Sequence, residues 1–97
     1  MDTEKIKADI AANRLEQAEK ELLACLEAGS DKAKGEKESR AECLYLLGRI
    51  AWKRGDKGAA ISRYEQAVAI DPESDAAVAL EQARQIMNFY HKDLYNP

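Results

Sequence analysis

The side chains that most often perform catalysis are few in this sequence and are not grouped. His91 is the single histidine among the 97 residues, and neither Cys25 nor Cys43 has a histidine nearby in the sequence. The cysteine spacing matches no metal-binding or redox motif, so we expect two buried, reduced thiols. The segment from Gly55 to Gly58 lacks the spacing of a phosphate-binding loop. We therefore predict no catalytic residue, no metal site and no cofactor.

A second group of residues has the chemistry of a protein-binding surface. Tyrosine, tryptophan and arginine are the residue types that dominate binding hot spots. With about 100° of rotation per helical residue, one face of a helix over residues 37–54 carries Glu42, Tyr45, Arg49, Trp52 and Lys53. Two simpler interpretations stay open, in which Trp52 packs on a neighbouring helix and the other side chains form an ordinary solvated face.

The overall charge excludes two classes of partner. Eighteen acidic residues against fifteen basic ones give a net charge of −3, and the pI is about 5.2. Phosphate binding requires a basic face, and helices that lie on lipid surfaces are usually rich in Lys and Arg on one side, so we expect neither nucleic acid nor membrane as partner. A signal peptide needs an uninterrupted apolar stretch, whereas charged residues recur throughout the N-terminal residues of this sequence. The expected compartment is therefore the cytoplasm.

The elements that must position these residues are all helical. Apolar residues at helical spacing predict five helices over about residues 3–12, 15–27, 37–54, 56–70 and 74–90, and no strand. Gly55 and the pair Asp71-Pro72 end the third and fourth helices, and Asp56 can cap the fourth. A charged, mobile loop is expected over about residues 29–40, and residues 91–97 are expected to fray.

Small residues within the third and fourth helices predict a close crossing. A glycine in mid-helix costs about 1 kcal/mol, so a packing reason is expected for Gly48. Ala60 lies one turn into the next helix, and together they allow the two backbones to approach. Tyr64 follows Ala60 by one turn and can cover the gap.

These residues resemble the tetratricopeptide repeat, which has the pattern W-x2-L-G-x2-Y, A-x3-F and P within about 34 residues. In residues 41–74 the matching positions are Leu44, Leu47, Gly48, Ala51, Ala60, Tyr64 and Pro72. Leucine and alanine replace the usual Trp and first Tyr. Residues 1–30 match more weakly, with Asn13-Arg14 standing where Gly-Asp would. The resemblance implies an all-α fold, a short right-handed α-solenoid of about five helices like those of small bacterial proteins.

On this basis, residues 1–97 are expected to form one domain. Its parts are a weak repeat over about 1–30, the charged loop over about 29–40, a repeat over 41–74, a capping helix over about 75–91 and a tail over 92–97. The register of a third repeat would bury Glu81, Gln82 and Gln85, which is costly for unpaired polar groups. We therefore expect a rotated capping helix whose buried stripe includes Leu80, Ala83 and Met87.

The resemblance also implies a function, because stacked helix hairpins form a concave groove lined by the first helix of each pair. The expected groove residues are Lys7, Glu42, Tyr45, Arg49, Trp52 and Lys53. The repeat's own packing does not require the tyrosine or the arginine, and the charges suggest a partner with apolar and acidic groups. Some members of the family bind the C-terminal carboxylate of a peptide with Lys and Asn side chains. We do not expect this mode of binding here, because no Asn occurs at the matching positions.

The predicted function is non-catalytic binding of an unidentified protein or peptide. The alternative is a self-associating piece that stacks end to end through its first helix, as a weak homodimer or larger assembly, since about three repeats are usually needed for stability.

Overall fold

The computed structural model describes residues 3–28 and 36–95, and all of its regular structure is helical. The helices are α1 (Thr3–Ala11), α2 (Leu15–Ala28), α3 (Glu36–Lys53), α4 (Lys57–Ile70) and α5 (Asp75–Tyr95). The described residues contain no strand. The all-α prediction is therefore confirmed.

One predicted boundary is wrong. Helix α5 continues to Tyr95, whereas the sequence was expected to fray after Tyr90. No glycine or proline occurs between Asp75 and Tyr95, so nothing in the local sequence stops the helix earlier. Most of the expected loop at 29–40 and the last two residues of the expected tail lie outside the described residues, and residues 36–40 belong to α3.

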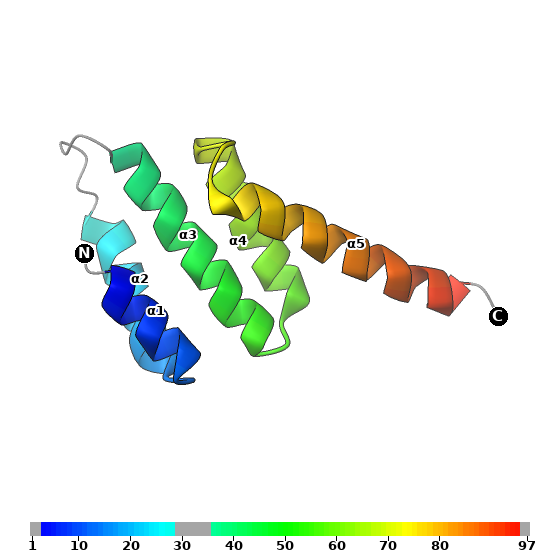
Figure 1. Cartoon of the computed structure of the whole chain (residues 1–97), viewed down its shortest axis with the longest axis horizontal. Helices are drawn as coiled ribbons and strands as arrows, with labels where there is room; N and C mark the ends of the chain where they lie inside the picture. Colours follow the sequence, from blue (N-terminus) through cyan, green and yellow to red (C-terminus); the bar gives the residue numbers. More distant parts are fainter. Residues whose placement is uncertain (1–2, 29–35, 96–97) are drawn as a thin grey trace.

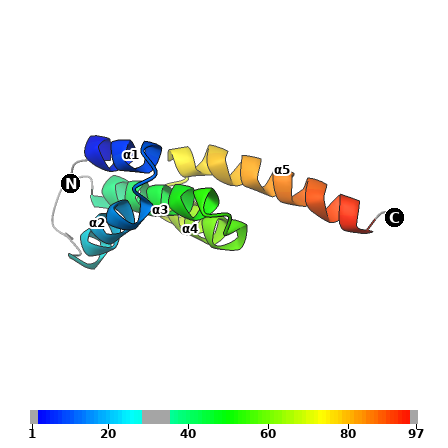
Figure 2. The same cartoon turned by 90° about the horizontal axis from the view of Figure 1, so that it is seen from below.

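The helices stack in chain order along the longest axis of the molecule (Figure 1). Helices α1 and α2 form one hairpin, α3 and α4 form a second, and α5 packs on α4 and α3. In Figure 2, α1 and α5 lie on one side of the molecule, α3 is set back between them, and α2 and α4 lie toward the opposite side. This arrangement is a short α-solenoid in which α1, α3 and α5 line the hollow side.

The first hairpin turns at a residue in the left-handed region. Asn13 has φ of 68°, a conformation that asparagine tolerates better than most side chains. Its backbone N–H donates to the carbonyl of Ile10 (3.0 Å), and that of Arg14 donates to the carbonyl of Asp9 (2.8 Å). This pair of hydrogen bonds is the Schellman arrangement, which satisfies carbonyls at the end of α1.

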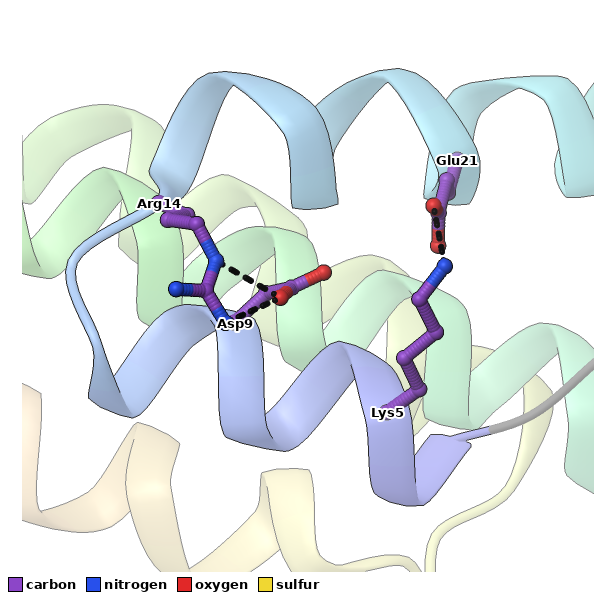
Figure 3. Close-up of polar contacts among 4 residues, drawn as sticks. All are labelled: Lys5, Asp9, Arg14 and Glu21. Carbon is purple, nitrogen blue, oxygen red and sulfur yellow. Dashed lines mark hydrogen bonds and ion pairs between the residues drawn. The ribbon is translucent and has the colours of Figure 1, made fainter.

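Side-chain ion pairs connect the two helices of the first hairpin (Figure 3). The Arg14 guanidinium lies 3.0 Å from Oδ1 of Asp9, whose carboxylate is only 5% exposed. Further along the hairpin, Nζ of Lys5 lies 3.5 Å from Oε2 of Glu21. The arginine at the turn therefore compensates one oxygen of the buried carboxylate, while Oδ2 has no hydrogen-bond partner among the described residues.

The second hairpin uses the same backbone turn with different residues. Gly55 has φ of 87°, and its N–H donates to the carbonyl of Trp52 (3.0 Å). The N–H of Asp56 donates to the carbonyl of Ala51 (2.9 Å). The Asp56 side chain then caps α4 by accepting a hydrogen bond from the N–H of Ala59 (3.1 Å). The predicted helix stop and the predicted cap are both confirmed.

Helices α3 and α4 cross closely at Gly48, as the small residues predict. A Cβ atom added to Gly48 would lie 2.6 Å from Cδ1 of Tyr64 and 3.2 Å from the carbonyl oxygen of Ala60. Real Cβ atoms are not found that close to a ring carbon, so only glycine fits here without movement of the tyrosine. The predicted roles of all three residues are confirmed.

The core consists of two buried clusters. The first joins α1, α2 and α3 and comprises Ile6, Ile10, Ala18, Leu22, Cys43, Leu46, Leu47 and Ile50. The second joins α3, α4 and α5 and comprises Ala41, Leu44, Ala60, Tyr64, Ala67, Ala76, Leu80 and Ala83. In the capping helix Leu80 and Ala83 are buried while Glu81, Gln82 and Gln85 are exposed, as expected, but Met87 is only half-buried. None of the described helices is long and apolar enough to cross a membrane.

Candidate partner-binding site

Four of the predicted groove residues line one cavity of about 300 Å³ on the hollow side of the solenoid. They come from successive turns of α3 and are Tyr45, Arg49, Trp52 and Lys53. Tyr64 of α4 closes the floor, and α5 supplies the opposite wall through Ala79, Gln82, Ala83 and Ile86. The capping helix therefore forms one side of the cavity. The sequence alone did not predict this position of α5.

The cavity is built around two tyrosines. The ring centroids of Tyr45 and Tyr64 lie 6.0 Å apart with an interplanar angle of 35°, within the range of favourable aromatic pairs. Burial raises the pKa of Tyr64, as does its neighbour Tyr45, while Arg49 acts in the opposite direction. The Tyr64 hydroxyl therefore stays protonated at neutral pH. A tyrosine hydroxyl can both donate and accept hydrogen bonds.

Cations cover faces of two of the aromatic rings. The guanidinium carbon of Arg49 lies 6.0 Å from the centroid of the Tyr45 ring. The ammonium nitrogen of Lys57 lies 5.2 Å from the centroid of the Trp52 ring. Each distance is within the cation–π range. Each cation therefore stabilises the ring that it faces.

The charge of the cavity is positive. Arg49 and Lys53 line it, and the lining contains no acidic residue among the described part of the chain. No ion pair to either side chain is found among the side chains that the structure describes, those of residues 4–27 and 40–88. In a chain of net charge −3, this is a local excess of cations beside aromatic surface.

The other two predicted groove residues neutralise each other. Nζ of Lys7 on α1 lies 3.4 Å from Oε2 of Glu42 on α3, and neither residue lines the cavity. The two side chains are half-buried, and a pair this close to solvent contributes about 0–1 kcal/mol. The predicted continuous face is therefore divided into an ion pair near α1 and a cationic aromatic cavity near α5.

Tyr45 corrects one expectation. The sequence suggested that the repeat's packing does not require it, but its half-buried ring packs against both core clusters. Trp52 is also half-buried and packs against the second cluster while lining the cavity, so it belongs to core and cavity at once. Substitution of either aromatic will therefore affect stability as well as any binding.

Some cavity residues were not identified from the sequence as site residues. Tyr64 was interpreted as the cover of Gly48, a role it has, and its ring is also the floor of the cavity. Gln82 was noted only as an exposed residue of the cap. No local signal marks Gln82 as a site residue, because its proximity to α3 depends on how α5 packs across α4.

The two cysteines have the environment of packing residues. Cys43 is buried, Cys25 is half-buried against the same cluster, and both are free thiols. Burial raises the pKa of Cys43 from 9.0 to about 12, and the neighbouring Cys25 adds to the shift. A thiol with this pKa is protonated at neutral pH and is a poor nucleophile. The side chain of His91 lies outside the described residues.

Two stacked helix hairpins and a capping helix, with a cavity between α3, α4 and α5, define a helical-repeat protein. A sequence model described as "Tetratricopeptide repeat" matches residues 8–73. The chain belongs to the tetratricopeptide repeat family, whose members generally mediate protein–protein interaction and are typically non-catalytic.

A solved structure agrees with this assignment. The chain is similar to the solution NMR structure of the Bacteroides fragilis protein BF1650, with 33% sequence identity and a TM-score of 0.77. The alignment covers 99% of this chain and 91% of that chain. No curated protein was found to match the sequence.

Proposed function

We propose that this protein is a non-catalytic interaction module that holds a segment of a partner protein in the cavity between α3, α4 and α5. The single observation that carries the proposal is the cavity itself, where Tyr45, Arg49, Trp52 and Tyr64 meet beside α5. Aromatic and arginine side chains in a concave site are the groups that contribute most to protein–protein affinity. Its prepared geometry reduces the entropy lost on binding.

The test combines capture of partners from the native host with a titration against each purified partner. We expect Arg49→Ala to weaken binding by more than about 1 kcal/mol while leaving the thermal unfolding midpoint nearly unchanged. The matched control is Arg84→Ala, which removes an exposed arginine that pairs with Glu65 and does not line the cavity. If the control weakens binding and Arg49→Ala does not, the partner binds elsewhere and the proposal fails.

Self-association through the first helix is the competing function. Of the described residues, the exposed large hydrophobic side chains are Leu23, Val78 and Ile86, and none is on α1. This distribution supports a solvated α1 better than a stacking surface. Sedimentation velocity at several protein concentrations separates the two functions, because end-to-end stacking requires the sedimentation coefficient to rise with concentration.

A further inference from the structure

From the same cavity we infer the chemistry of the partner segment: a large apolar side chain with a carboxylate one or two residues away. This inference rests on the proposed function and adds what the segment must contain. The apolar side chain enters between the tyrosines and α5, and the carboxylate meets Arg49 and Lys53. The ligand class is an acidic, aromatic or leucine-containing peptide.

The size of the cavity favours one inserted side chain. Its volume of about 300 Å³ is at the lower end of the range of ligand pockets. The walls include Tyr45, Tyr64, Trp52 and Ile86, which offer apolar surface on opposite sides. A single Phe, Tyr, Trp or Leu side chain can fill such a space, and aromatic pairing with the tyrosines adds to the area it buries.

The charges select an acidic neighbour and reject a basic one. Among the side chains of residues 4–27 and 40–88, none is a carboxylate partner of Arg49 or Lys53. A ligand carboxylate would therefore gain charge-assisted hydrogen bonds to both without displacing any of these residues. A ligand cation would instead meet two like charges. It would also have to compete with Arg49 and Lys57 for the tyrosine and tryptophan ring faces.

The ion pair beside α1 limits where the carboxylate binds. Lys7 is matched by Glu42, so a ligand carboxylate at that position would have to displace an existing partner. At Arg49 no such displacement is needed. The acidic residue of the ligand should therefore lie over the C-terminal half of α3, close to α5, rather than between α1 and α3.

The experiment selects binders for the full chain from a displayed library of random peptides and then measures matched pairs. We expect enriched peptides to carry Asp or Glu within two residues of an aromatic or leucine. Replacing that acid by its amide should weaken binding about tenfold. With Arg49→Gln both peptides of a pair should bind about equally, whereas Arg49→Lys should retain part of the preference for the acid.

A second pair of variants tests the cavity itself. Gln82→Trp places a large ring in the cavity from an exposed position of α5 and should abolish binding of the selected peptides. Glu81→Trp puts the same ring on the adjacent exposed residue, outside the cavity lining, and should leave binding unchanged. Circular dichroism melts confirm that both variants are folded.

The outcomes separate the two levels of the proposal. If enriched peptides are neutral or basic, yet lose binding with Gln82→Trp, the cavity binds peptides but the acidic specificity is wrong. If the peptides bind equally to Gln82→Trp and Glu81→Trp, both the inference and the proposed function fail. Enrichment of no peptide at all counts against both, and concentration-dependent sedimentation would identify a second copy as the occupant.

Discussion

The two hairpins of this protein reach the same turn with different residues, and only the second contributes to the cavity. The left-handed position is Asn13 in the first hairpin and Gly55 in the second. Seven residues before each turn lie Ile6 and Gly48, and nine residues after each turn lie Leu22 and Tyr64. These two positions thus carry medium-sized side chains in the first hairpin. In the second they carry a glycine, which has no side chain, and a tyrosine, which has a large ring.

This difference in side-chain size between the two hairpins has a functional consequence. Ile6 and Leu22 are buried in the first core cluster, which joins α1, α2 and α3. Gly48 lets Tyr64 lie against α3, from where the ring also reaches the cavity floor. A small residue at a helix crossing therefore does two things: it brings the backbones together and it frees an aromatic side chain to line a binding site.

The largest effect is expected in the first hairpin. Leu22→Ala removes a side chain that is 0% exposed and should lower the free energy of unfolding by about 2–5 kcal/mol. Leu23→Ala is the matched control, since the same substitution one position later affects an exposed side chain and should cost far less. Denaturant melts of both variants measure the difference. Equal losses would contradict the assignment of the first core cluster.

The second crossing is expected to be nearly as sensitive. Gly48→Leu should cost about 1–3 kcal/mol or more, because the new side chain collides with Tyr64 and the Ala60 backbone. Gly58→Ala is the control, since nothing lies within 4 Å of its added Cβ and the helix gains propensity. An unchanged melting temperature for Gly48→Leu would refute the close crossing.

A transplant between the hairpins sharpens the same test. The double substitution Gly48→Ile and Tyr64→Leu installs the first hairpin's pair at the second crossing. Because leucine lacks the ring carbons nearest the added Cβ, the double variant should be more stable than Gly48→Ile alone. It should also lose part of the peptide binding, since the tyrosine floor is gone. A double variant no more stable than the single one would show that the backbones cannot separate.

Substitutions at the turn of the second hairpin should change stability by less than those at the helix crossing. Gly55→Ala places a Cβ at φ of 87° and should cost about 1–2 kcal/mol. Gly55→Asn should cost less, because asparagine adopts this region more readily and already does so at position 13. Thermal melts of the two variants measure the order. A more stable alanine variant would mean that the second turn does not require the left-handed conformation.

The last prediction concerns the reactivity of the cysteines and not stability, since Cys25 of α2 and Cys43 of α3 are free thiols in or against the first core cluster. In a Cys25→Ala background, Cys43 should react with a thiol reagent at pH 8 more slowly than in the unfolded chain, by about two orders of magnitude or more. Its pKa is about 12 in the folded protein against 9.0 when exposed. The unfolded chain therefore loses the proton first, and the thiol's contribution to stability declines as pH rises from 9 to 12. Rapid labelling under native conditions would contradict its burial.

The sequence by itself determined the local features of the molecule. The bounds of α1 to α4, the two turn residues, the Gly48 crossing with Tyr64, and the burial of Leu80 and Ala83 on α5 follow from spacing and residue type within short segments. Helical periodicity fixes which side chains share a face, and glycine, asparagine and aspartate mark turns and caps through their own backbone chemistry. These signals need no knowledge of distant residues.

Only the tertiary structure decided how those faces combine. The pairing of Lys7 with Glu42, the double role of Tyr45 and the wall that α5 adds to the cavity all join residues from different helices. Periodicity leaves the distance and angle between helices open, because both depend on how side chains of two surfaces interlock. The candidate site residues could therefore be predicted from the periodicity of each helix alone. Their division into the Lys7–Glu42 ion pair and the cavity required the packed structure.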